Sequence, residues 1–153
     1  GKREVLRARA GAAVDQLKAR ADEAGFDAGR IGAIGFCFGG ATVLELARSG
    51  RDDIDGVVSF HGSLGTSLPA EAGAVKASVL VLNGADDSYV SAEEIAGLQK
   101  EMTEAGADWQ FVNFAGAVHC FAEADANSPG CLYHERSAKR AYRMMDDFFA
   151  EVF

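Results

Sequence analysis

Three residues with reactive side chains follow three separate apolar runs of the sequence. Cys37 follows residues 31–36, Asp87 comes shortly after residues 78–84, and His119 comes shortly after residues 109–114. A cysteine acts as a nucleophile when a histidine takes its proton, and a carboxylate holds that histidine in the required tautomer. These residue types, in the order nucleophile, acid, histidine, predict a triad that attacks an acyl group.

Cys37 lies in the segment GFCFGG, residues 35–40. The pattern Gly-x-Cys-x-Gly has the shape of the Gly-x-Ser-x-Gly elbow, in which glycines let a strand and a helix approach closely. Free amides at the start of the following helix favour the thiolate of Cys37. The amide of Phe38 is expected to face a developing oxyanion. The alternative is a small buried cysteine that only packs at this crossing.

The other polar residues at the strand ends also have structural interpretations. Asp86 and Asp87 lie in a turn, where aspartates commonly cap helices. His119, considered alone, is also consistent with a hydrogen-bonded surface residue that has no role in catalysis. His61 also ends an apolar run; it could line the same cleft, but we assign it to packing. His134 begins a helical pattern and is expected to be solvated.

The elements that position these residues follow from the hydrophobic pattern. Apolar runs that do not alternate with polar residues are typical of parallel strands buried on both faces. Strands that alternate with helices predict an α/β fold in which helices cover both faces of a parallel sheet. We expect one domain over residues 1–153, with helices at 4–24, 41–48, 91–105 and 134–152, strands at 30–36, 56–62, 78–84 and 109–114, and loops at 63–77 and 123–133.

Two patterns give more detail about the helices. In the first helix, the apolar face is predicted to consist of Val5, Ala8, Ala12, Ala13, Leu17 and Ala21. Ser91 and Glu94 form a capping-box pattern at the start of the third helix. Since parallel strands end at the same edge of a sheet, Cys37, Asp87 and His119 are expected to meet there.

Composition excludes several classes of partner. Fifteen basic and twenty-three acidic residues give a net charge of −8, which repels nucleic acid and anionic membranes. No apolar stretch has the length of a membrane span, so we expect a cytoplasmic protein. The three cysteines Cys37, Cys120 and Cys131 are odd in number and lack metal-ligand spacing, so neither a disulfide nor a metal site is expected.

The three motifs together resemble the dienelactone hydrolase family. The segments are GFCFGG at 35–40, GADDSYV at 84–90 and VHCF at 118–121. The resemblance implies an α/β-hydrolase-like sheet and hydrolysis of a small ester or lactone through an acyl-thioester. It also implies Cys37 as nucleophile, His119 as base and Asp87 as acid, with no metal and no organic cofactor.

The chain departs from the family pattern in two places. Family members have several strands before the elbow helix, whereas this chain starts at the helix that precedes the elbow. The strand at 30–36 would then have a bare edge, which predicts a homo-oligomer or a complementing N-terminal segment. Cys120 stands beside His119, where a small or polar residue is usual. We hypothesise that Cys120 is oxidised with Cys37 if the two come close.

Three other interpretations of the sequence differ in how well they fit its motifs. Gly-x-Cys-x-Gly also marks glutamine amidotransferase domains, but those have a glutamate two residues after the histidine, and here Glu123 is the first acid after His119. A non-catalytic scaffold or interaction module that retains the triad stays open. A nucleotide-binding site is disfavoured because the glycines at 32, 35, 39 and 40 do not form Gly-x-Gly-x-x-Gly.

Overall fold

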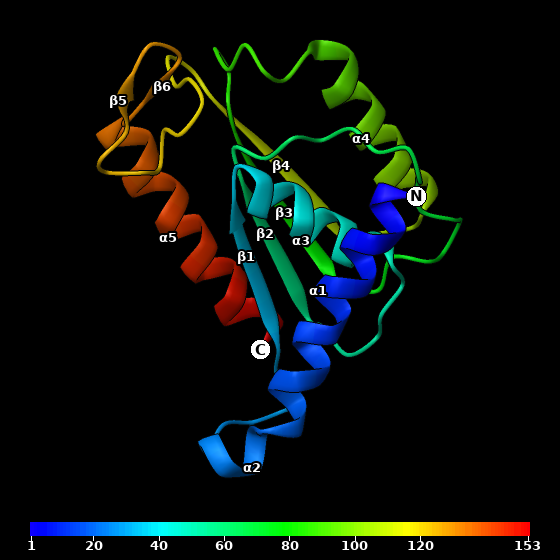
Figure 1. Ribbon diagram of the computed structural model, residues 1–153. Coiled ribbons are helices and arrows are strands. Elements are labelled where there is room, and N and C mark those ends of the chain that lie inside the picture. Colours follow the sequence, from blue (N-terminus) through cyan, green and yellow to red (C-terminus); the bar gives the residue numbers. More distant parts are fainter.

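The computed structural model describes residues 1–153, and its centre is a four-stranded parallel sheet. The strands are β1 (Gly32–Phe36), β2 (Gly56–Phe60), β3 (Ser78–Gly84) and β4 (Trp109–Phe114). They lie in the order β1-β2-β3-β4, and each pairs in parallel with its neighbour (Figure 1). The predicted parallel α/β architecture is confirmed, and all four strands fall within the expected ranges.

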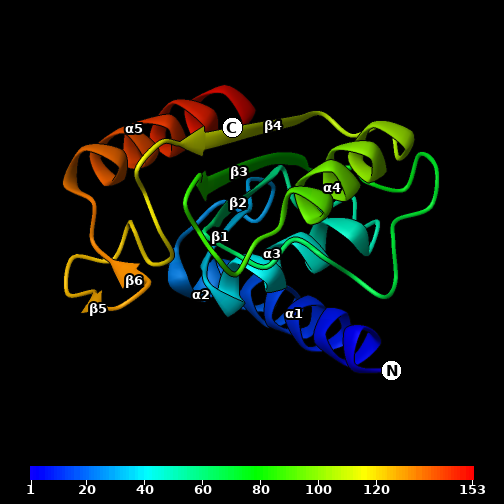
Figure 2. The same cartoon turned by 90° about the horizontal axis from the view of Figure 1, so that it is seen from above.

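Helices cover both faces of this sheet, as the alternating pattern predicts. Figure 2 shows α5 (Glu135–Val152) on one face, with α1 (Lys2–Ala19), α3 (Phe38–Arg48) and α4 (Ala92–Glu104) on the other. The remaining elements are the short helix α2 (Ala21–Ala24) and a hairpin of β5 (Asn127–Ser128) and β6 (Cys131–Leu132). None of the helices combines the length and apolarity that crossing a membrane requires.

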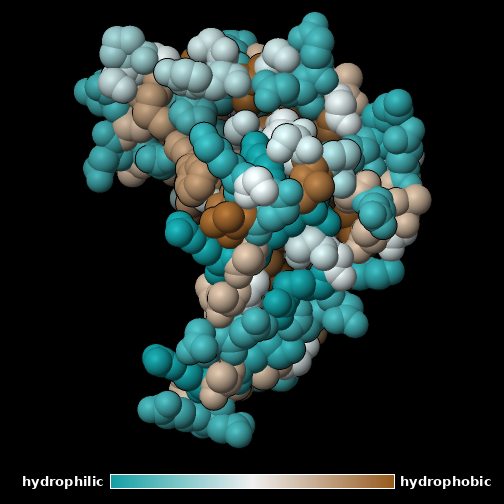
Figure 3. All heavy atoms as spheres, turned by 45° about the vertical axis from the view of Figure 1, so that its right-hand side comes forward, coloured by the Kyte–Doolittle hydropathy of each residue, from teal (hydrophilic) through white to brown (hydrophobic).

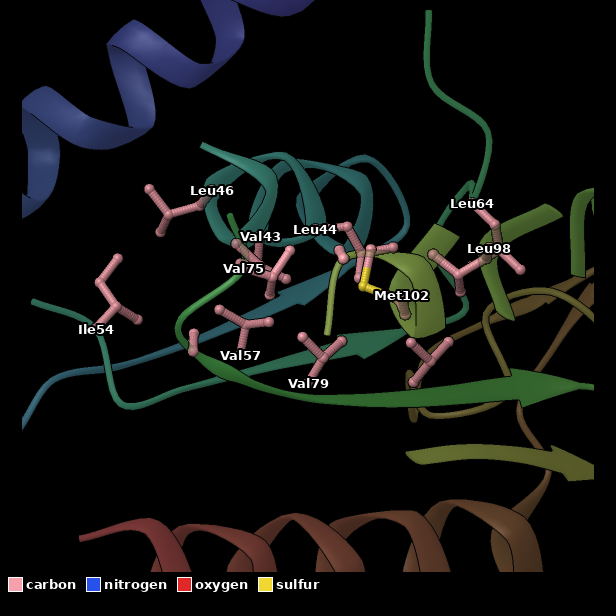
Figure 4. Close-up of a cluster of buried hydrophobic side chains, with 14 of the residues drawn as sticks. Val43, Leu44, Leu46, Ile54, Val57, Leu64, Val75, Val79, Leu98 and Met102 are labelled. Atoms are coloured by element: carbon pink, nitrogen blue, oxygen red, sulfur yellow. The ribbon is translucent and has the colours of Figure 1, made fainter. Parts of the chain in front are cut away.

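The two faces of the sheet form two hydrophobic clusters because successive strand residues point in opposite directions. Val57 and Val79 point toward α3 and α4 (Figure 4), and Val81 belongs to the same cluster. Their neighbours in the sequence point toward α5 and belong to a cluster that includes Val58, Phe60, Leu80, Leu82, Phe121 and Ala141. The view in Figure 3 shows a mainly hydrophilic exterior with a few hydrophobic patches. The core therefore fixes the strand ends that carry the reactive residues.

The start of α4 is confirmed as a capping box. The Ser91 hydroxyl accepts a hydrogen bond from the Glu94 amide at 3.2 Å, and the Glu94 carboxylate accepts one from the Ser91 amide at 3.1 Å. These two bonds satisfy amides that the first helical turn leaves without partners. The cap fixes the residue at which the loop after β3 ends and α4 begins. This loop carries Asp87.

The predicted inner face is wrong over α1, although Ala21 of α2 is buried as predicted. Val5 and Leu17 are 51% and 45% exposed. The face that packs against α3 contains Leu6, Arg7, Ala10, Gly11 and Val14, which are buried or half-buried. Arg7 lies on this face as well, and its Nε donates to Glu45 of α3 at 2.8 Å. Apolar spacing assigns arginines to solvent, so the side of α1 that carries Arg7 is not predicted to face inward.

The expectation of three free cysteines is also wrong, because Cys120 and Cys131 form a disulfide. The β5–β6 hairpin turns the chain back, so that Cys131 forms a β-bridge with His119 and the Leu132 amide donates to the His119 carbonyl at 3.1 Å. Cys37 is the free cysteine. The hypothesised Cys37–Cys120 bond is therefore not formed in this structure.

The edge at β1 has no partner strand in this chain. β1 pairs with β2 on one side only, and Ile34 on this strand is 48% exposed. Figure 1 shows β1 at the border of the sheet. Such an edge presents unpaired backbone groups to any strand that can approach it.

Candidate functional site

A sharp turn between β1 and α3 presents Cys37. Its φ of 51° is a left-handed value, which side chains other than glycine seldom adopt. A side chain at Gly35 would place its Cβ 2.1 Å from the Gly39 carbonyl oxygen. A Cβ at Gly40 would lie 2.7 Å from Ser59 Oγ. Glycine is required at both positions, so the elbow predicted from the motif has a steric basis here.

The residue after the nucleophile opens a helix. Phe38 is the first residue of α3, and Cys37 is its N-cap. The first amides of a helix have no carbonyl partner within that helix. The Phe38 amide is therefore available to a negatively charged oxygen bound beside Cys37, which is the role that the motif predicts for it.

The histidine and the preferred aspartate are in direct contact. His119 Nδ1 lies 2.8 Å from Asp87 Oδ2. Asp87 is buried, and its second oxygen accepts a hydrogen bond from the Tyr89 amide at 2.9 Å. Asp86 is exposed. The structure thus pairs His119 with Asp87 rather than with its neighbour, and it leaves His119 Nε2 to face other groups.

The nucleophile and the histidine are near each other but are not hydrogen-bonded. Cys37 Sγ and a ring nitrogen of His119 lie within 4.8 Å. The thiol instead donates to Glu123 Oε1 at 3.2 Å, and Cys37 Sγ lies 3.3 Å from His61 Nδ1. We call Cys37, His61 and Glu123 the thiol cluster. In this arrangement the sulfur contacts His61 and Glu123 instead of the predicted base, His119.

The surroundings of Cys37 favour the thiol over the thiolate. Burial raises the pKa of Cys37 to about 12, and the hydrogen bond to Glu123 and the charges of Glu123 and Asp87 act in the same direction. The position at a helix N-terminus predicts a lowered pKa, so that expectation is wrong for this arrangement. The carboxylate and the loss of solvation outweigh the helix dipole.

His61 is more than the packing residue that its apolar strand indicates. Its side chain is fully buried, its φ is 38°, and Nε2 has no hydrogen-bond partner. A left-handed non-glycine residue and an unpaired buried nitrogen each cost about 1–3 kcal/mol. Burial lowers the pKa of His61 to about 4, and the charge of His119 adds to this effect, so the ring is neutral. A residue that only packs in the core requires neither a left-handed backbone nor an unpaired buried nitrogen.

No motif or strand end in the sequence links Glu123 to the site. It lies in the loop after His119, and its position depends on how residues 115–134 fold back toward the elbow. His61 does have a signal, because it ends β2 at the same edge as Cys37. Its contact with the sulfur follows from the β1–β2 register, in which Phe36 pairs with Phe60.

A pocket of about 630 Å³ opens beside these residues. Cys37 and His119 line it together with Phe38, Tyr89 and the N-terminal part of α1. A small organic molecule fits a cavity of this size. A substrate in the pocket would contact both the sulfur and the histidine.

Comparison with known proteins agrees with this arrangement. The family model described as the dienelactone hydrolase family matches residues 2–153. A Salmonella typhimurium protein named as a carboxymethylenebutenolidase is 32% identical over 146 residues, which are 90% of this chain and 52% of that protein. An uncharacterized Caenorhabditis elegans protein is 31% identical over 134 residues, which are 83% of each chain.

Comparison with a solved structure also indicates this family's fold. A dienelactone hydrolase-like promiscuous phosphotriesterase from metagenomic libraries is 38% identical, with a TM-score of 0.89. The match covers 100% of this chain and 64% of that one. The chain thus spans about half of the Salmonella relative and about two thirds of this structure. Because the family match runs from the start of α1 to the last residue and includes the elbow, the chain belongs to the dienelactone hydrolase family.

Proposed function

We propose that this protein is a carboxylic ester hydrolase that cleaves esters or lactones, with Cys37 as nucleophile, His119 as general base and Asp87 as the group that orients His119. The main support is the 2.8 Å contact between His119 and Asp87, placed within reach of Cys37 and beside a pocket. The name of the Salmonella relative, carboxymethylenebutenolidase, points to the same reaction class.

The reaction begins when the Cys37 proton passes to His119 Nε2. The thiolate then attacks the acyl carbon, and the Phe38 amide donates a hydrogen bond to the resulting oxyanion. His119 returns the proton to the leaving alcohol, and an acyl-thioester remains on Cys37. Water attacks this thioester while His119 takes its proton, and collapse of the second oxyanion releases the acid and restores the thiol.

The resting arrangement adds one requirement to this sequence. The Cys37 thiol donates to Glu123, so its side chain must turn toward His119 before the proton can move. The distance of at most 4.8 Å is compatible with a rotation of the Cys37 side chain without movement of the backbone. A substrate that displaces Glu123 would favour this rotation and would remove the charge that holds the proton on sulfur.

Steady-state hydrolysis of p-nitrophenyl acetate tests the assignment. We expect Cys37→Ala to reduce the rate to the background. Asp87→Asn should lower kcat by about 10²–10⁴-fold, because the amide no longer fixes the His119 tautomer. Asp86→Asn is the matched control, since Asp86 is the exposed neighbour, and its rate should stay within about twofold of the wild type.

Two results would count against the proposal. If both aspartate variants keep the wild-type rate, Asp87 has only a structural role. If the wild-type chain releases no nitrophenol above the background, the alternative of a scaffold or interaction module that retains these residues is favoured.

The cytoplasmic location and the oligomeric state remain predictions. The Cys120–Cys131 disulfide is a kind of bond that is rare in the cytosol. The unpaired β1 edge supports self-association or pairing with a further segment. Size-exclusion chromatography with light scattering measures this directly, and a monomer at all concentrations would contradict self-association.

A further inference from the structure

Three donor atoms of different chemical kinds converge in the thiol cluster. Cys37 Sγ lies 3.3 Å from His61 Nδ1 and 3.2 Å from Glu123 Oε1, and the donor atoms of the three residues all lie within 4.8 Å of one another. Cys37 comes from the elbow, His61 from the end of β2 and Glu123 from the loop after His119. Their distance in the sequence explains why no metal-ligand spacing marks them.

These separations are close to those of a zinc site. With Zn–S near 2.3 Å and Zn–N and Zn–O near 2.0–2.2 Å, tetrahedral geometry places neighbouring donors about 3.3–3.6 Å apart. The two contacts of the sulfur, 3.3 and 3.2 Å, lie at or just below the short end of that range, whereas the His61 ring comes no closer than 3.9 Å to Glu123 Oε1. Glu123 is on the surface and 45% of its side chain is exposed, so its carboxylate is free to adjust.

The state of His61 is a second and independent observation. Its ring is fully buried, and Nε2 has no hydrogen-bond partner, although this atom lies 3.9 Å from Glu123 Oε1. A metal on Nδ1 would fix the ring proton on Nε2, so that the ring has one defined tautomer.

From these observations we propose that Cys37, His61 and Glu123 form a binding site for Zn²⁺. A thiolate, an imidazole and a carboxylate suit zinc, whereas Mg²⁺ and Ca²⁺ prefer oxygen ligands only. Binding converts the Cys37 thiol and Zn²⁺ into a zinc thiolate and releases one proton to solvent. Three protein ligands leave a fourth position for water or for His119, which lies beside Cys37.

Occupancy of this site would block the hydrolase reaction, because the sulfur electrons are then held by the metal. This inhibitory effect depends on the proposed function, but the metal site does not. Cys120 Sγ also lies within 4.8 Å of Cys37 and His119. Reduction of the Cys120–Cys131 disulfide by an added dithiol, which is itself oxidised to a disulfide, would free that sulfur as an additional ligand, and the affinity for zinc should rise.

Metal titration tests the site without any activity measurement. Co²⁺ added to the wild-type chain should produce a thiolate-to-cobalt charge-transfer band at one equivalent, and Zn²⁺ should remove it. Cys37→Ser should abolish the band. Glu123→Gln and His61→Asn should each weaken Zn²⁺ binding by about 10–100-fold, measured by competition with a chromophoric chelator. Asparagine suits position 61 because it tolerates a left-handed backbone.

Matched controls exist for both variants. Asp125→Asn changes an exposed acid in the same loop as Glu123. His134→Asn removes a histidine that caps α5, and asparagine is itself a favoured N-cap. Both controls should bind Zn²⁺ as the wild type does. Circular dichroism establishes that each variant is folded, and if His61→Asn does not fold, Glu123→Gln decides the test.

Two outcomes would overturn the proposal. One is the absence of a charge-transfer band in the wild type. The other is unchanged affinity in Glu123→Gln and His61→Asn together with a loss in His119→Asn, which would assign the metal to Cys37 and His119 alone. Ester hydrolysis without zinc binding would refute the metal site only. Zinc binding without ester hydrolysis would refute the proposed function only.

Discussion

Two polar clusters lie at opposite ends of α3, and they differ in how well their members are paired. At the N-terminal end is the thiol cluster of Cys37, His61 and Glu123. Near the C-terminal end, Arg48 donates to Glu45 at 3.1 Å and makes two bonds to Glu101 at 2.9 and 2.8 Å. Arg7 of α1 completes this second group, which we call the salt-bridge network.

The salt-bridge network is satisfied throughout. Glu45 is fully buried, but both of its oxygens accept hydrogen bonds from arginines. Arg48 and Arg7 also donate to the Leu64 and Leu68 carbonyls, respectively. None of the buried side-chain atoms without a partner belongs to this network. Its arrangement is consistent with a structural role, since it joins α1 to α3.

The thiol cluster has the opposite character. It contains an unpaired buried nitrogen, two left-handed residues other than glycine, and a thiol bonded to a carboxylate that raises its pKa. A protein retains such costs where chemistry requires them. Of the two clusters, the salt-bridge network is paired, whereas the thiol cluster beside the candidate nucleophile keeps unused bonding capacity at His61 Nε2. Three variants test this division.

The largest effect is expected from Glu45→Ala. Removing the shared acid takes the carboxylate partner from Arg7 and one of the two carboxylate partners from the buried Arg48, which costs about 3–5 kcal/mol of unfolding free energy. Urea denaturation measures this value. Glu104→Ala, at an exposed acid of α4, is the control and should change stability by less than about 0.5 kcal/mol. A change below about 1 kcal/mol for Glu45→Ala would show that the network does not support the fold.

The second prediction concerns the pH dependence of stability. The folded pKa of His61 is about 4, below its ordinary value of 6.5, so the unfolded chain binds more protons between these values. Stability from the neutral ring is therefore present above pH 6.5 and is lost as pH falls toward 4. The wild type should lose about 3 kcal/mol more than His61→Asn between pH 7 and pH 4. Equal losses in both proteins would contradict a neutral buried His61.

The smallest effect is expected from Glu123→Gln. The amide removes the negative charge beside the sulfur, so the pKa of Cys37 should fall although burial remains the largest cause of its elevation. Alkylation by iodoacetamide at pH 8 should then be several-fold faster than in the wild type. Asp125→Asn should alkylate at the wild-type rate. A slower reaction in Glu123→Gln would mean that the carboxylate activates the thiol rather than restrains it.

Much of the fold follows from local patterns in the sequence. The apolar runs at β2 and β3 and the capping box at Ser91 each predict their element without knowledge of the rest. The parallel order follows from the alternation of strands and helices. The convergence of Cys37, Asp87 and His119 on one edge then follows from topology, because all three come after strands of the same sheet.

The remaining features depend on contacts between distant segments. The disulfide requires the β5–β6 hairpin, which the sequence shows only as a loop. The inner face of α1 depends on Glu45 of α3, and a pattern of apolar residues cannot show that Arg7 is directed inward. Glu123 reaches Cys37 only through the path of the loop after His119. Each of these contacts involves charged or sulfur-containing side chains, which hydrophobic periodicity does not describe.

The central claim, that Cys37 accepts an acyl group, is tested most directly by intact-mass spectrometry after brief incubation with p-nitrophenyl acetate. We expect a single acetyl adduct on the wild-type chain when the reaction is stopped with acid before water attacks the thioester, and no adduct on Cys37→Ala. Nitrophenol should appear in a burst equal to the protein concentration. An unmodified mass in the presence of released nitrophenol, or an adduct that survives Cys37→Ala, would contradict the account.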